Sequence, residues 1–143
     1  MTVLRRGLMS LLLVLALVGC GSSNYAILSA TASQAEVAKG ETVTVTVEVG
    51  KTEGRQQVQG TDTLIVSVAA PPGITVTPVV RSYEEEQPDG SLKIVMRPGG
   101  NLPRVFEFEL TVGPEAEAGE QTVTIHLQAN GEDTTKDLTL TVK

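Results

Sequence analysis

Regular alternation of valine with polar residues is the feature that most constrains the fold of this chain. Between Thr42 and Val49 every second residue is valine, and the residues between are threonine or glutamate. Because side chains of a β-strand point alternately to opposite faces, this pattern predicts a strand with one buried face and one face in water. Valine and threonine also favour a pleated sheet over a helix, in which β-branched side chains lose rotational freedom.

The same alternation recurs along the chain, and turn-forming residues separate the segments. Proline, glycine, asparagine and aspartate cluster between them, as in Pro71-Pro72-Gly73, Pro88-Asp89-Gly90 and Asn130-Gly131. Seven or eight short strands without intervening helices predict one immunoglobulin-like antiparallel β-sandwich over residues 26–143. The further alternating segments are Leu64–Val68, Leu92–Met96, Phe106–Val112, Val123–Leu127 and Leu138–Val142.

The first twenty residues have the order of a secretory signal peptide. Two arginines precede an apolar run from Leu8 to Val18, which is about half the length that a bilayer-spanning helix needs. The segment Leu17-Val18-Gly19-Cys20 resembles the lipobox of bacterial lipoproteins. This resemblance implies cleavage before Cys20, a diacylglyceryl thioether on its sulfur, and often a further acyl chain such as palmitate on the new amino terminus. An uncleaved single-pass anchor with a fortuitous cysteine is the alternative.

The predicted organisation is therefore a cleaved helical signal peptide at 1–19, a lipidated cysteine with a short tether at 20–25, and the sandwich at 26–143. Two acyl chains suffice for stable membrane anchoring. The domain is expected outside the cytoplasm, held on a membrane by its lipid. Gly21, rather than aspartate, after the cysteine resembles the pattern that directs lipoproteins to the outer membrane in two-membrane bacteria.

Charge argues against nucleic-acid binding. The whole chain has a net charge of −6, and removal of residues 1–19 with their two arginines leaves nine basic against 17 acidic residues, a net charge of −8. Such a surface repels phosphate backbones.

Parts of the body resemble bacterial immunoglobulin-like domains of the CARDB and NPCBM-associated type. The segment from Pro72 to Pro78 is similar to their Pro-Gly-aromatic-x-Val-x-Pro motif, with Ile74 where an aromatic residue is usual. The resemblance implies an adhesion, spacer or scaffold module without catalytic residues. The other segments that carry it are Val37–Val45, Ala118–Ile125 and Leu138–Val142.

The sequence offers few residues for catalysis or metal binding, so we expect no enzyme and no cofactor. The one histidine, His126, falls on the polar face of its strand, and Cys20 is the predicted lipid site. Met96, Phe106 and Phe108 lie at buried positions of the alternation and are predicted to be core residues.

Two polar segments are the predicted contact surfaces for an envelope protein partner. Residues 50–62 and 81–89 are candidates because longer loops are either functional or merely mobile. The alternative function is ligand binding, of weakly held Ca²⁺ or a glycan, at the Tyr83–Asp89 loop. Three consecutive glutamates cannot all face one ion, however, and a solvated loop is their simpler interpretation. The candidate contact residues are Lys51, Arg55, Gln56, Tyr83, Glu84, Glu85 and Glu86.

Overall fold

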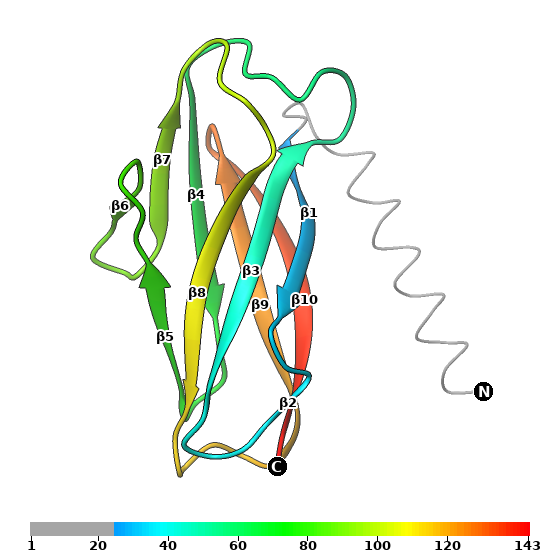
Figure 1. Cartoon of the computed structure of the whole chain (residues 1–143), viewed down its shortest axis with the longest axis vertical. Coiled ribbons are helices and arrows are strands. Elements are labelled where there is room, and N and C mark those ends of the chain that lie inside the picture. The colour runs from blue at the N-terminus through cyan, green and yellow to red at the C-terminus, as the bar shows by residue number, and fades with distance from the viewer. Residues whose placement is uncertain (1–24) are drawn as a thin grey trace, which may run out of the picture.

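The computed structural model describes residues 25–143, and all regular secondary structure in this range is β (Figure 1). The predicted signal peptide and Cys20 lie outside the described residues. No helix within 25–143 is long and apolar enough to cross a bilayer. The strands are β1 (Tyr25–Ala32), β2 (Glu36–Val37), β3 (Thr42–Lys51), β4 (Asp62–Ala69), β5 (Ile74–Val79), β6 (Glu85–Glu86), β7 (Leu92–Met96), β8 (Arg104–Val112), β9 (Gly119–Ala129) and β10 (Glu132–Val142).

The strands form two stacked sheets, which confirms the predicted all-β sandwich. One sheet has the order β1-β3-β8-β5, and the other has the order β2-β10-β9-β4-β7-β6. Eight strands have five residues or more, and β2 and β6 have two residues each. The pairing is antiparallel, as predicted, except that the two residues of β2 pair parallel with the end of β10. Two residues are too few to show a two-residue alternation, so the sequence pattern gave no sign of β2.

The inner faces of the two sheets make an almost entirely aliphatic core. Every valine of the Thr42–Val49 alternation is fully buried, as the pattern predicts. In the register of β3 with β8, Val47 pairs with Phe106 and Val45 with Phe108, and both phenylalanines are fully buried. The buried position predicted for Met96 is confirmed as well. Full burial of each such side chain contributes roughly 1.5–3 kcal/mol to folding.

A glycine is required where the chain passes from β4 to β5. Gly73 has a φ of +89°, and a Cβ atom there would lie 2.6 Å from the backbone of Ala116. Gly90, in the turn between β6 and β7, has a similar φ of +85° but open space around it. The first position therefore needs glycine for conformation and for space, and the second for conformation alone.

The chain crosses between the sheets along both long sides of the sandwich. On one side, residues 80–84 connect β5 of the first sheet to β6 of the second, and we call β5, residues 80–84, β6 and β7 the β5–β7 side (Figure 1). On the other side lie β1, β2 and β10, which we call the β1–β10 side.

Candidate functional site

The first predicted contact segment, residues 50–62, is attached to the domain at Lys51 and Val58, whereas residues 52–57 are exposed. β3 continues through Lys51, whose side chain is buried with its Nζ atom 5.8 Å from the centre of the Tyr25 ring. The Gln56 side chain accepts from the Lys51 amide at 2.9 Å and donates to the Lys51 carbonyl at 2.8 Å. Lys51, a predicted contact residue, is therefore buried, with its aliphatic stem and its backbone both used in the fold. Arg55 is exposed, as expected.

The rest of this segment is tied to the connection between β7 and β8. Val58 is buried, its amide donates to the Gly100 carbonyl at 2.9 Å, and its own carbonyl accepts from the Gly99 amide at 2.8 Å. Leu102 donates to the carbonyl of Gln56 at 3.0 Å. The segment is therefore long because its second half forms hydrogen bonds with the β7–β8 connection and buries Val58.

The second predicted segment, residues 81–89, is only partly solvated. Tyr83 is 47% exposed, and Glu85 and Glu86 are exposed in the short strand β6. Glu84 is buried instead, contrary to the expectation of a solvated glutamate run. The turn from Arg81 to Glu84 folds this carboxylate back, so that its Oε1 atom accepts from the Arg81 amide at 3.0 Å.

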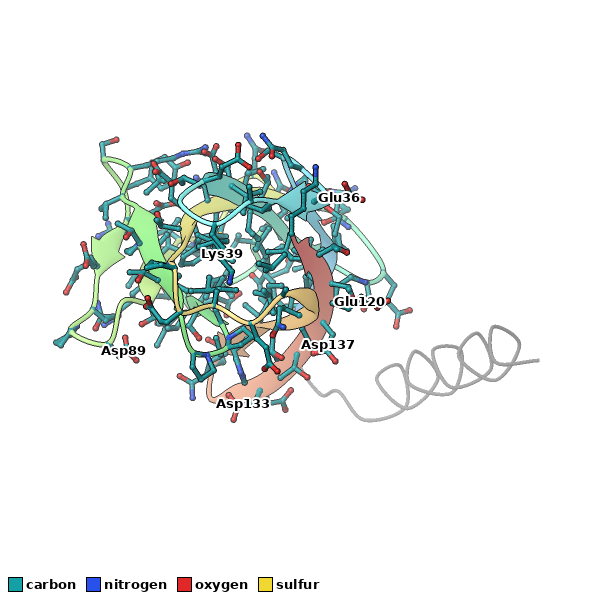
Figure 2. All side chains as sticks on the ribbon, turned by 90° about the horizontal axis from the view of Figure 1, so that it is seen from below. Glu36, Lys39, Asp89, Glu120, Asp133 and Asp137 are labelled. Atoms are coloured by element: carbon teal, nitrogen blue, oxygen red, sulfur yellow. The ribbon has the colours of Figure 1, made fainter. Side chains whose placement is uncertain are left out.

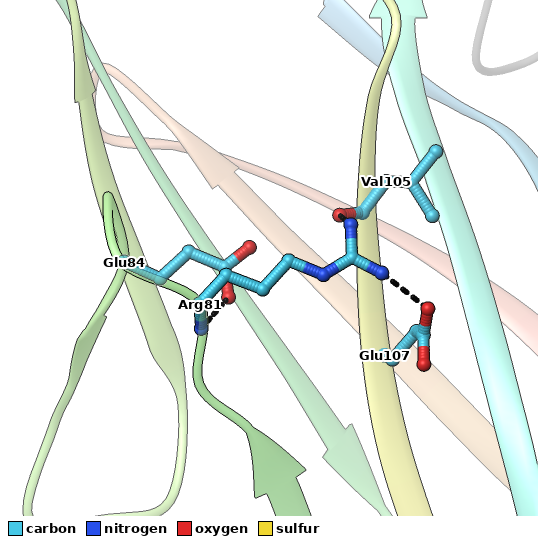
Figure 3. Close-up of polar contacts among 4 residues, drawn as sticks. All are labelled: Arg81, Glu84, Val105 and Glu107. Carbon is cyan, nitrogen blue, oxygen red and sulfur yellow. Dashed lines mark hydrogen bonds and ion pairs between the residues drawn. The ribbon is translucent and has the colours of Figure 1, made fainter.

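Arg81 fixes the β5–β6 connection onto β8. Its guanidinium forms an ion pair with Glu107 and donates to the carbonyl of Val105 at 3.4 Å (Figure 3). The pKa of Arg81 is raised, first by hydrogen bonding with the Tyr83 side chain and then by the negative charges of Glu107 and Glu84. Arg81 thus has a structural role that no local sequence motif predicted.

Arg104, at the start of β8, is the second arginine that the sequence did not single out. Its guanidinium lies over the Tyr83 ring, with the central carbon 5.1 Å from the ring centre, a cation–π contact. The Nε atom is buried and has no hydrogen-bond partner among residues 25–143. No acidic side chain in the described part of the chain forms an ion pair with Arg104.

Arg81, Tyr83 and Arg104 line an open hollow, together with the turn that follows β7. This turn is also the one that holds Gln56 and Val58, so both predicted contact segments meet the same connection between β7 and β8. The hollow presents two guanidinium groups and one exposed aromatic ring, and guanidinium groups are well suited to bind an anionic group. The remaining lining residues are Gly99, Gly100, Asn101, Pro103 and Val105.

The acidic residues of the Tyr83–Asp89 loop do not converge. Within residues 25–143 no three histidine, cysteine, aspartate or glutamate side chains are grouped so as to hold a metal ion. The pKa of Asp89 is lowered by hydrogen bonds from the Ser91 hydroxyl and amide. Asp89 lies at the surface, where it and Asp133 of β10 line one shallow hollow (Figure 2). His126 is exposed, as predicted.

Comparison with known proteins supports the fold. No protein-family model matches the sequence, and no curated protein matches it. The structure is similar to a FixG-related protein from Vibrio parahaemolyticus, with a TM-score of 0.58 and 12% identity over 85% of this chain and 98% of that one. At this identity the similarity concerns the fold alone. The resemblance to CARDB and NPCBM-associated domains stays a prediction.

Two bacterial lipoproteins are also among the similar structures. A conjugative transposon lipoprotein from Bacteroides eggerthii has a TM-score of 0.45 and 12% identity, over 81% of this chain and 93% of that one. A lipoprotein from Bacteroides thetaiotaomicron has a TM-score of 0.46 and 16% identity, over 85% of this chain and 82% of that one.

Proposed function

We propose that this chain is a lipoprotein of the bacterial cell envelope, anchored through Cys20, that acts without catalysis by binding another envelope protein. The lipobox-like Leu17-Val18-Gly19-Cys20 supports the anchor. The chemistry of the β5–β7 side supports the binding role.

The observation that carries the binding role is the set of exposed side chains on the β5–β7 side. Four large hydrophobic side chains are exposed among residues 25–143, and three of them, Val80, Tyr83 and Val95, belong to this side. Two arginines lie next to Tyr83. Tyrosine and arginine are enriched at protein–protein interfaces and at the residues that dominate their binding energy.

The proposed anchor also orients the domain. Tyr25 begins β1 at the same end of the sandwich as residues 52–61 and the connection between β7 and β8 (Figure 1). Five residues from Cys20 to Tyr25 span at most about 17 Å. In this arrangement the end that carries these loops faces the bilayer, and the β5–β7 side is open to a neighbouring protein in the same membrane.

Photocrosslinking in intact cells tests the binding role. A photoreactive amino acid at Val80, which is exposed on the β5–β7 side, is expected to capture one defined envelope protein. The matched control is the same amino acid at Thr135, which is exposed on β10 of the opposite side. Capture of the same mixture of abundant neighbours from both positions would contradict the proposal.

The anchor is tested by replacing the lipid site. Cys20→Ser is expected to release the protein from the membrane fraction, whereas Ser22→Ala in the tether should leave it there. Mass spectrometry of the membrane-purified protein should find residues 1–19 removed and acyl chains on Cys20. A free thiol at Cys20 with the first 19 residues still attached would rule the anchor out.

Glycan binding at the Tyr83–Asp89 loop is the second candidate function, and the exposed Tyr83 ring favours it. Arg104 covers one face of that ring, which leaves the other face for a sugar. Calorimetry with oligosaccharides, compared between the wild type and Tyr83→Ala, would detect this activity.

A further inference from the structure

The two arginines of the hollow differ in how their charge is balanced. Arg81 is neutralised by Glu107 and also bonds the Val105 carbonyl. Arg104 lies half-buried, with neither an ion pair nor a hydrogen-bond acceptor for its guanidinium among residues 25–143. A guanidinium is a planar fork that pairs with carboxylates through two parallel hydrogen bonds. Arg104 therefore has unused capacity to bind an anionic group.

The lining of the hollow is consistent with this capacity. None of its eight lining residues is acidic, although the chain has 17 aspartates and glutamates. The nearby Glu107 is occupied by Arg81. The other nearby acid, Glu84, is buried, with one oxygen bonded to the Arg81 amide and the other without a partner. The Tyr83 ring holds the Arg104 guanidinium in place, which reduces the entropy that its ordering by a ligand would cost.

The strand pairing around the hollow favours an extended peptide as the ligand. β8 pairs with β3 as far as Arg104, but it pairs with β5 only as far as Glu107. Beyond that point the chain of β5 leaves the sheet, and only the Arg81 side chain reaches the Val105 carbonyl. An extended segment can therefore lie beside the start of β8 with an acidic side chain over Arg104.

We infer that Arg104, stacked on Tyr83, binds a carboxylate on an extended acidic segment of the partner protein. This inference rests on the proposed function, because it assigns the chemistry by which that partner is recognised. This inference also accounts for selectivity. The negative charge of the domain repels acidic proteins in general, whereas Arg104 attracts a carboxylate that is placed over it.

The direct test measures peptide binding by the full lipidated chain in detergent micelles. A fluorescent peptide of six Glu-Thr repeats should bind saturably by fluorescence anisotropy, and added salt should weaken the binding. Arg104→Gln should weaken it roughly tenfold or more, because a charge-assisted bidentate pair is lost. Arg104→Lys, which keeps the charge without the planar fork, should fall between the two.

Matched controls separate this site from general attraction of charge. Lys39→Gln removes one positive charge from an exposed turn that does not line the hollow and should leave peptide binding within about twofold of the wild type. A Lys-Thr peptide should not bind. The inference is overturned if Lys39→Gln and Arg104→Gln weaken binding equally, if Arg104→Gln has no effect, or if an oligouronate or anionic vesicles bind at Arg104 more tightly than the peptide.

Crosslinking in cells distinguishes failure of this inference from failure of the proposed function. With the photoreactive amino acid at Val80, Arg104→Gln should reduce the yield of the specific adduct at least severalfold. An unchanged yield of that adduct would overturn the role of Arg104 while leaving the protein-binding function in place. Absence of any specific adduct from the wild type would contradict the function itself.

Discussion

The β5–β7 side and the β1–β10 side end the same two sheets with different chemistry. On the β5–β7 side three large hydrophobic side chains are exposed and two arginines surround a hollow. On the β1–β10 side only Leu28 is exposed among the large hydrophobic residues. The two sides share one core, so the difference concerns what each surface can bind rather than how it is supported.

Both sides carry features that discourage uncontrolled pairing of sheet edges. The edge strand β5 contains Pro78, and β6 is two residues long and doubly acidic. The edge strand β1 has an irregularity in its pairing at Leu28, and β10 places Lys136 opposite the buried Ile125. What distinguishes the β5–β7 side is the combination of a protected edge with exposed apolar and cationic side chains. In the proposed function, this combination forms the surface that binds the partner.

The largest effect is expected from truncating a side chain of the core, which supports both sides of the sandwich. Phe106→Ala leaves a cavity in the middle of the core and should lower the free energy of unfolding by about 3–5 kcal/mol. Tyr25 and Tyr83 lie on opposite sides, so single-tyrosine variants report on each side by fluorescence during urea unfolding. The two transitions should coincide. If one side unfolded at a lower urea concentration, the shared core would not couple them. Phe106→Leu is the control and should cost much less.

The next largest effect is expected on the β5–β7 side alone, at the glycine that directly precedes β5. Gly73→Ala combines an unfavourable backbone conformation with a clash against Ala116 and should cost at least about 2 kcal/mol. Gly90→Ala has the same conformational penalty without the clash and should cost about 1 kcal/mol. Thermal unfolding measures both variants. Equal losses would show that the close approach to Ala116 contributes nothing.

A smaller effect is expected on the β1–β10 side. The Tyr25 hydroxyl donates to Asp62 at 2.6 Å, and Tyr25→Phe should cost about 1–2 kcal/mol. Burial, together with the hydrogen bond and charge of Asp62, raises the pKa of Tyr25. Because the pKa is higher in the folded state, this stabilisation is complete below the unfolded pKa near 10 and is lost as pH rises above it.

Denaturation between pH 8 and 12 should therefore show a loss of stability that Tyr25→Phe lacks. Tyr83→Phe keeps Tyr25 and should retain the alkaline loss. An identical pH profile for the wild type and Tyr25→Phe would contradict the assignment.

The smallest effect on stability concerns the protection of the β10 edge. Lys136→Val should change the free energy of unfolding by no more than about 0.5 kcal/mol, since Lys136 is exposed. It should nevertheless promote self-association, visible by sedimentation velocity, because the edge loses its charged residue. Lys39→Val makes the same change in an exposed turn and should sediment like the wild type under the same conditions.

The sequence predicted the strands better than the candidate site. Alternation located the main strands because burial on one face dictates every second residue, as in Val43 to Val49. The contact residues were less predictable, since loop residues were assumed to be exposed. Both Lys51 and Glu84 are buried instead, Lys51 against the Tyr25 ring and Glu84 with its carboxylate accepting from the Arg81 amide.

By itself, the sequence determined the all-β class and the buried phenylalanines, and it supplied the lipobox-like segment on which the predicted anchor rests, because these follow from local order and spacing. Only the tertiary structure decided that Arg81 reaches Glu107, 26 residues away, and that Arg104 lies over Tyr83. The physical reason is that β5 leaves β8 at Glu107, which brings the β5–β6 connection over the start of β8. No short motif encodes a contact between segments that lie far apart in the sequence and meet only because β5 pairs with β8.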